Sequence, residues 1–326
     1  MTSRSVQPIF ILSLPRSGST LLQRLLLSSG ECATLGEASL MLRFLGQDEL
    51  ISRKATYWEF LVDIAMTDMR AQWPDFDAAY ASGVRQMMSK IYAGLAGGKR
   101  YFVDKTPRYT LIAEEIYKVF PDAKYLVLWR HPLAVASSMS ASSRRGYWFP
   151  DEYAIDLHAG LSRLQDFATR HADEICQVRY EDLVTDQTSV LRTIAAYLDL
   201  TCLTDVADKT LPTSAGGGLG DATGTRKYSK ISDRSLTSWH GQIDNWYRRR
   251  WVRRYCTGRV AEIMQEHGYG TEDVLSNGPH PVGLWSGLKD LLFAGHRRHR
   301  RLKKPLQVAR EVARLRGQHG FDIVFR

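Results

Sequence analysis

Closely spaced cysteines are absent from this sequence of 326 residues. Its four cysteines are far apart and form no Cys-x-x-Cys pair, at positions Cys32, Cys176, Cys202 and Cys256. This pattern argues against a zinc site and against a disulfide framework, and it is typical of a reducing compartment.

Long apolar runs are absent as well. The longest run near the amino terminus, Ile9–Leu14, ends at Pro15 and Arg16. It is too short for the core of a signal peptide or for a transmembrane helix. We therefore expect a cytoplasmic protein that forms one large domain or two modest ones.

Most of the chain has no net charge, since basic and acidic residues are equally frequent there. Residues 1–240 contain 27 Lys and Arg against 27 Asp and Glu, whereas residues 241–326 contain 17 against 8. The whole net charge of +9 (17 − 8) therefore belongs to the carboxyl-terminal quarter. A nucleic-acid-binding protein with a uniformly basic surface is not expected, but a basic tail that touches an anionic surface is compatible with this pattern.

Short apolar runs alternate with longer amphipathic stretches over the first 200 residues, which predicts a parallel α/β sheet. The expected strands are residues 8–13, 100–104, 125–129 and 175–180, and helices are expected over 19–28, from about 109, and from Pro132. Two helical insertions at about 57–71 and 77–96 are expected to cover the sheet. The loop over 211–228 is rich in Gly, Thr and Ser, and such long loops are often functional.

The strand–turn–helix segment PIFILSLPRSGSTLL, residues 8–22, carries the strongest chemical signal. It predicts a row of unpaired N–H groups from Ser17 to Leu21 at the positive end of a helix dipole, which is an anion-binding arrangement. Ser19 stands where a nucleotide-triphosphate loop would have its lysine, so phosphate or sulfate binding is expected, without the usual ATP and Mg²⁺.

This segment resembles the 5′-phosphosulfate loop of sulfotransferases that use 3′-phosphoadenosine 5′-phosphosulfate (PAPS). The resemblance implies that Arg16, Ser17, Gly18, Ser19 and Thr20 bind the phosphosulfate. It also implies a P-loop-like three-layer α/β sandwich with a central parallel sheet, helical insertions and a basic helical tail. In the family an Arg at a strand end and a Ser eight residues later hold the 3′-phosphate, and Arg130 and Ser138 match this spacing (138 − 130 = 8).

Two further motifs resemble the branch of tyrosylprotein and bacterial carbohydrate sulfotransferases. Gly36-Glu37 follows Arg16 at the spacing of a catalytic Gly-Glu pair (37 − 16 = 21), and Val103–Pro107 resembles the strand end that supplies an active-site lysine, here Lys105. Pro107 stands where other sulfotransferases have a catalytic histidine, so a histidine base is not expected.

The resemblance also extends to nucleotide-binding residues further along the chain. The segment Val178–Leu183 looks like a strand-end motif of the superfamily, with Tyr180 as a candidate nucleotide contact. The family's last nucleotide-binding loop is expected near residues 220–228, where only Arg226 and Lys227 are similar to it. The alternative role of Tyr180 is packing in the core. Arg226 and Lys227 would alternatively be solvated residues of a loop.

Sulfonate transfer explains why these residue types occur together. Glu37 would accept the proton of the acceptor hydroxyl as general base, while Lys105 and Arg16 would stabilise charge on the transferred group. No metal is expected. As an alternative to the catalytic role, Glu37 is only a carboxylate that stabilises the first turn of its own helix, and Glu31 is then the next candidate base. The alternative for Lys105 is a solvated lysine at the end of a strand.

The carboxyl-terminal residues allow two interpretations. Apolar residues at helical spacing precede a basic cluster at 296–304; they are Leu284, Trp285, Leu288, Leu291 and Leu292. The helix either lies on an anionic membrane or packs this apolar side on the catalytic domain. Likewise, the aromatic cluster at 147–149 either lines an acceptor pocket or packs at a helix end. We expect a catalytic domain over 1–276 and a basic amphipathic extension over 277–326.

The predicted function is sulfonate transfer from PAPS to a hydroxyl of a carbohydrate or lipid-linked saccharide. The predicted location is the cytoplasm, with peripheral contact at the inner face of the membrane and no nucleic-acid partner. A tyrosine side chain or a small phenol is the alternative acceptor. A P-loop nucleotide or small-molecule kinase and a non-catalytic anion-binding module are the alternatives from other classes.

Overall fold

The computed structural model describes residues 6–46, 57–141, 147–201, 203, 234–271, 275 and 283–299. Its strands are β1 (Gln7–Ser13), β2 (Cys32–Thr34), β3 (Tyr101–Lys105), β4 (Lys124–Trp129) and β5 (Cys176–Arg179). Its α-helices are α1 (Ser19–Leu27), α2 (Leu40–Leu45), α3 (Tyr57–Gln72), α4 (Phe76–Ala96), α5 (Ala113–Val119), α6 (Pro132–Ala141), α7 (Leu161–Arg170), α8 (Tyr180–Thr185), α9 (Gln187–Leu198), α11 (Arg234–Thr237), α12 (Trp246–Tyr255) and α13 (Arg259–Glu266). Residues 284–299 form a further helix at the carboxyl-terminal end of the described chain.

A five-stranded parallel sheet in the order β2-β3-β1-β4-β5 forms the centre of the molecule. Strands β1, β3, β4 and β5 confirm the four predicted apolar strands. Strand β2 was not predicted, because three residues are too few to show a periodicity. It pairs with β3 at one edge of the sheet.

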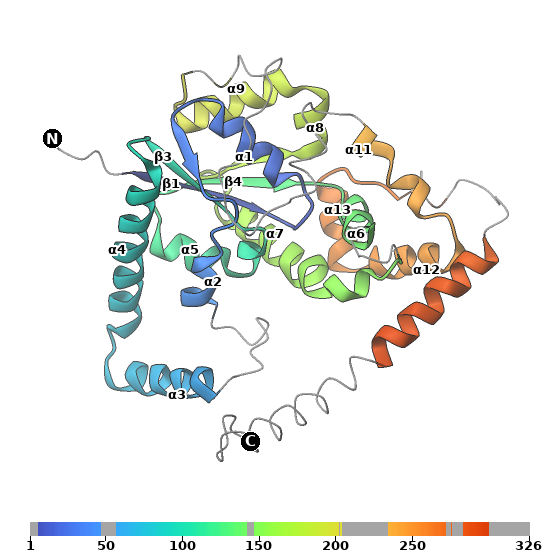
Figure 1. Ribbon diagram of the computed structural model, residues 1–326, viewed down its shortest axis with the longest axis horizontal. Helices are drawn as coiled ribbons and strands as arrows, with labels where there is room; N and C mark the ends of the chain where they lie inside the picture. The colour runs from blue at the N-terminus through green and yellow to red at the C-terminus, as the bar shows by residue number, and fades with distance from the viewer. Residues whose placement is uncertain are drawn as a thin grey trace, which may run out of the picture.

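Two helical layers cover the sheet, which confirms the three-layer α/β architecture (Figure 1). Side chains alternate along each strand, so β1 sends Ile9 and Ile11 to one face and Phe10 and Leu12 to the other. The first face packs against leucines of α1, α8 and α9, and the second packs against α4, α5, α6 and α7.

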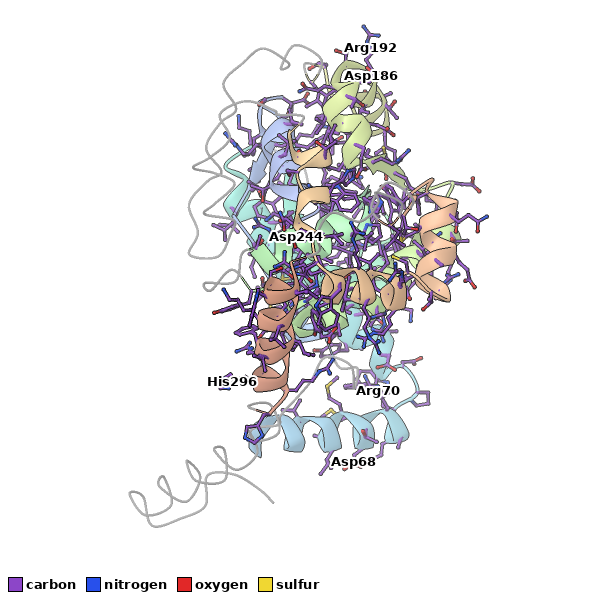
Figure 2. The ribbon with its side chains drawn as sticks, turned by 90° about the vertical axis from the view of Figure 1, so that its right-hand side faces the viewer. Asp68, Arg70, Asp186, Arg192, Asp244 and His296 are labelled. Atoms are coloured by element: carbon purple, nitrogen blue, oxygen red, sulfur yellow. The ribbon has the colours of Figure 1, made fainter. Side chains whose placement is uncertain are left out.

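The two predicted insertion helices behave differently. Helix α4 packs on the sheet side through Val84, Met88 and Tyr92. Helix α3 lies at the lower end of the molecule, away from the sheet, where Asp68 and Arg70 are labelled (Figure 2). The expectation that both helices cover the sheet is therefore right for α4 and wrong for α3. No helix of the described ranges is long and apolar enough to cross a membrane.

The aromatic cluster at 147–149 packs under the last helix. Trp148 and Phe149 are 2% and 3% exposed, and the ring of Tyr147 stacks on Phe293 with centroids 4.3 Å apart. The packing alternative is therefore right for this cluster. The expected boundary between residues 276 and 277 lies outside the described residues, so the domain division stays a prediction.

One carboxyl group, that of Asp104 in β3, is completely enclosed on the α4 side of the sheet. Its Oδ2 accepts hydrogen bonds from the hydroxyls of Tyr92 (2.7 Å) and Tyr109 (3.1 Å). The Tyr109 hydroxyl in turn accepts the N–H of Met41 at 3.3 Å. Burial raises the pKa of Asp104 from 3.8 to about 6, although the hydrogen bonds from Tyr92, Tyr109 and Thr106 lower it.

This raised pKa predicts a pH dependence of stability. Between about pH 4 and pH 6 the folded chain holds a proton on Asp104 that the unfolded chain has released, so the free energy of unfolding decreases as the pH rises through this window. The slope from this group approaches about 1.4 kcal/mol per pH unit. Asp104→Asn keeps an oxygen that accepts both tyrosine hydroxyls but has no proton to lose.

Urea unfolding of both proteins from pH 4 to pH 7 measures this effect. The variant should gain stability relative to the wild type as the pH rises. Two curves that stay parallel over the whole range would contradict the raised pKa.

Candidate active site

Every predicted site residue of the described ranges except Ser138 follows the carboxyl end of a strand. Arg16–Thr20 follow β1, Glu37 follows β2, Lys105 ends β3, Arg130 follows β4, and Tyr180 follows β5. Parallel strands bring these ends to the same edge of the sheet, where α/β proteins bind their ligands. Arg226 and Lys227 lie outside the described residues.

The loop between β1 and α1 has a backbone that requires glycine at Gly18. Gly18 has a φ of +94°, and a Cβ there would lie 2.4 Å from the ring of Tyr180. Arg16 also has a positive φ, of 69°. The ring of Tyr180 therefore packs directly on the loop that resembles the phosphosulfate site, and only glycine leaves room for it.

The row of unpaired N–H groups is shorter than predicted. The N–H of Ser17 donates to the carbonyl of Leu14 at 3.2 Å, and the N–H of Leu21 donates to Gly18 at 2.9 Å. Across the described ranges, the N–H groups of Gly18, Ser19 and Thr20 have no acceptor. These three groups stand at the positive end of the nine-residue helix α1, which favours an anion.

Arg130 connects the loop to two other parts of the chain. Its Nη1 donates to the carbonyl of Arg16 at 2.7 Å, its Nη2 donates to the carbonyl of Ser235 at 3.0 Å, and its Cζ lies 4.4 Å from the ring centroid of Tyr180. The guanidinium has five N–H donors in total. Arg130 thus holds the loop through the carbonyl of Arg16.

The two predicted phosphate-binding groups also meet each other. Arg16 Nε donates to Ser138 Oγ at 3.2 Å, across 122 residues of sequence. The structure therefore brings Arg16, Arg130, Ser138 and Tyr180 together.

Ser235 is a site residue that the sequence analysis missed. It lies in α11, where its carbonyl accepts from Arg130 and its Oγ is 2.7 Å from the hydroxyl of Tyr180. No motif surrounds this serine, so the sequence offers no signal for it. Tyr180 itself is 8% exposed.

Glu37 and Lys105 form an ion pair at the same edge. Lys105 Nζ lies 2.9 Å from Glu37 Oε1, and the side chains are 1% and 26% exposed respectively. The solvated alternative for Lys105 is therefore wrong. Helix α2 begins only at Leu40 and has no acidic residue in its first turn, so the helix-charge alternative for Glu37 is wrong as well.

Buried hydrogen bonds hold the segment that carries Glu37. The amide Nε2 of Gln23, which is 1% exposed, donates to Thr34 Oγ1 (2.6 Å) and to the carbonyl of Gly36 (3.0 Å). On the other side of Glu37, Thr106 Oγ1 accepts the N–H of Ser39 at 3.0 Å. Sequence analysis missed Gln23, because a single glutamine in an apolar helix has no pattern of its own.

Glu31 is not an alternative base, which corrects that expectation. It precedes β2, so it lies at the amino ends of the strands, whereas the candidate site lies at their carboxyl ends. The Oε1 of Glu31 accepts from the N–H and the hydroxyl of Thr201, both at 3.2 Å, and its Oε2 lies 3.6 Å from Arg100 Nη1. Glu31 therefore stabilises the edge that faces away from the site.

His131, next to Arg130, is held in its neutral form. Its Nδ1 accepts the N–H of Leu133 at 3.2 Å and its Nε2 lies 2.9 Å from the carbonyl of Gly270. Burial lowers its pKa from 6.5 to about 4. Because both nitrogens are engaged, this ring is not placed to accept a proton from a substrate.

The donor set of this edge fits a ligand with several anionic oxygens. It combines three backbone N–H groups, two arginines and the hydroxyls of Ser19 and Thr20. Within the described parts of the chain, no group of three or more His, Cys, Asp or Glu side chains could hold a metal ion.

Comparison with known proteins agrees with this site. Residues 8–205 match the model of a sulfotransferase family, which includes every predicted site residue except Arg226 and Lys227. The chain is 30% identical over 144 residues to the nodulation protein NoeE of Sinorhizobium fredii (strain NBRC 101917 / NGR234). That match covers 43% of this chain and 33% of NoeE, so the chain spans about a third of the relative's length.

A solved structure has the same fold. The sulfotransferase domain from the curacin biosynthetic pathway superposes with a TM-score of 0.53 at 20% identity, over 82% of this chain and 99% of that domain. The family model alone covers more than half of the chain. The chain is therefore a member of the sulfotransferase family.

Proposed function

We propose that this sulfotransferase transfers a sulfonate group from PAPS to an acceptor hydroxyl with Glu37 as general base. The observation that carries the proposal is the Glu37–Lys105 ion pair of 2.9 Å beside the loop that Arg130 fixes. PAPS supplies the sulfonate. The N–H groups of Gly18–Thr20 and the guanidinium of Arg16 would bind its phosphosulfate, and Arg130 and Ser138 would bind its 3′-phosphate.

Each side chain has a defined task in this proposal. The acceptor oxygen forms a bond to sulfur as the bond from sulfur to the 5′-phosphate oxygen breaks, and the hydroxyl proton moves to Glu37. Lys105 pairs with Glu37 at 2.9 Å and would stabilise charge on the transferred group or the leaving oxygen. Tyr180, Arg226 and Lys227 complete the proposed nucleotide site.

The proposed acceptor is a carbohydrate or a lipid-linked saccharide, with a tyrosine or a small phenol as the alternative. We place the protein in the cytoplasm, in peripheral contact with the inner face of the membrane through its carboxyl-terminal extension, residues 277–326. Five large apolar side chains exposed on the last helix support this placement.

The nucleotide preference tests the donor. PAPS or the 3′,5′-bisphosphate product should raise the melting temperature far more than ATP with Mg²⁺, because ATP has no 3′-phosphate for Arg130 and Ser138. A ligand at a hundredfold excess over its Kd stabilises by about 2.7 kcal/mol. Equal shifts with ATP and the bisphosphate would contradict PAPS as donor.

Removing the Arg130 guanidinium tests the 3′-phosphate site. Arg130→Ala should raise the bisphosphate Kd about ten- to a hundredfold in titration calorimetry, because a charged hydrogen bond contributes about 1.5–3 kcal/mol. Arg100→Ala is the matched control, since Arg100 pairs with Asp199 and Glu31 at the opposite edge. If both variants bind the bisphosphate with the Kd of the wild type, Arg130 has a structural role only and does not bind the 3′-phosphate.

Glu37→Gln tests the general base, with Glu31→Gln as the same chemical change at the other edge. With the best acceptor from a screen using radiolabelled PAPS, Glu37→Gln should lower kcat by about 10²–10⁴, because it cannot take the proton. The bisphosphate Kd should stay the same, and Glu31→Gln should keep its kcat. Full turnover by Glu37→Gln would remove this residue from the mechanism.

A further inference from the structure

The last helix, residues 284–299, has two different faces. Its inner face packs on α12, where a Cβ on Gly287 would lie 2.3 Å from Trp246 Nε1. Asp290 on the same face is 2% exposed, and its Oδ2 accepts from Asn245 Nδ2 (2.9 Å) and Arg248 Nε (2.7 Å). A buried, fully paired carboxylate and a close backbone contact fix how this helix sits on the domain.

The outer face carries the apolar residues that the sequence analysis singled out. Their exposed fractions are 75% for Leu284, 78% for Trp285, 39% for Leu288, 42% for Leu291 and 64% for Leu292. The expectation that this apolar side packs on the catalytic domain is therefore wrong, because the helix packs through its other side. Five large apolar side chains on one exposed helix face indicate an interaction surface.

A pocket of about 380 Å³ lies beside this face, between α12 and the last helix. Arg250, Arg254 and Arg298 line it together with Trp246, Tyr247 and Leu291. Arg298 pairs with Asp151 at 2.8 Å. Among the described residues, Arg250 and Arg254 have no carboxylate within ion-pair distance, and both are exposed.

Leu291 belongs both to the pocket and to the exposed apolar face, so the cationic and apolar groups are continuous. Arginines next to an exposed apolar face are suited to bind a phosphate attached to acyl chains. The phosphate would accept hydrogen bonds from the arginines, and the leucines and the tryptophan would insert into the acyl layer. The sequence that follows this helix adds further positive charge, because residues 300–326 contain 8 Lys and Arg against 2 Asp and Glu.

We propose that α12 and the last helix form a docking site for an anionic phospholipid surface, with a lipid phosphate bound between Arg250 and Arg254. The site deepens the membrane contact named in the proposed function, and it brings the protein to the layer that would hold a lipid-linked acceptor. Figure 2 shows His296 near the carboxyl-terminal end of this helix, in the lower part of the molecule, whereas Arg192 on α9 lies at the top.

Vesicle flotation of the full chain tests the site with phosphatidylcholine vesicles, with and without phosphatidylglycerol. The wild type should bind vesicles that contain phosphatidylglycerol, and salt should weaken this binding. Arg250→Ala/Arg254→Ala should lower the binding constant about 30-fold, since each basic residue near an anionic surface contributes about a factor of five. Trp285→Ala/Leu292→Ala should lower it at least about tenfold through lost apolar burial.

Lys118→Ala/Arg192→Ala is the matched control. It removes the same charge from exposed positions on α5 and α9, and it should bind vesicles as the wild type does. A thermal shift with the 3′,5′-bisphosphate, measured on each preparation, reports the nucleotide site separately. Vesicle binding without a bisphosphate shift would contradict the proposed function and leave the docking site intact.

Four results would overturn the docking site. The first is no binding to either kind of vesicle, and the second is equal binding to both kinds. The third is an equal loss of binding in the control and in Arg250→Ala/Arg254→Ala. The fourth is self-association without lipid that Trp285→Ala/Leu292→Ala abolishes, because the apolar face would then be an interface between two copies of the chain.

Discussion

The guanidinium of Arg130 is the contact on which the arrangement of the site depends. It joins the loop after β1, the strand β4 and the helix α11, and it lies over the ring of Tyr180 that follows β5. Neighbouring strands of a parallel sheet are connected through long crossovers, and Arg130 links the segments that follow three of the strands. Because Arg130 holds the loop and is also the proposed 3′-phosphate ligand, the proposal couples nucleotide binding to the order of this loop.

Strand β3 places two neighbouring charged side chains on opposite faces of the sheet, one in the core and one in the candidate site. Asp104 and Lys105 are neighbours in sequence, but their side chains leave opposite faces of the sheet. Asp104 lies among tyrosine hydroxyls, one of which holds the start of α2. Lys105 pairs with Glu37 just ahead of that helix. The same strand end therefore positions the segment that carries Glu37 and supplies the cation beside it.

The last helix also has two faces with different surroundings, one packed on α12 and one exposed to solvent. Asp290 and Gly287 fix it to α12, and this leaves its leucines and Trp285 to solvent. A helix in an aqueous protein normally buries its apolar side. Here five large apolar residues lie on the exposed side, while Asp290 and Gly287 lie on the side that packs on α12. This reversal is the observation on which the proposed docking site rests.

The sequence by itself determined the elements whose rules are local. Apolar runs predicted four of the five strands, and the residues around Gly18 predicted a turn between β1 and α1 with unpaired N–H groups. The spacing of Arg130 and Ser138 predicted two groups that the structure brings to Arg16. The tertiary structure alone decided that Gln23 binds the carbonyl of Gly36, that Ser235 contacts Arg130 and Tyr180, and that the last helix exposes its leucines. Each of these outcomes depends on which partner is nearest in space, and most of the partners are remote in the sequence, so no local pattern of residues encodes them.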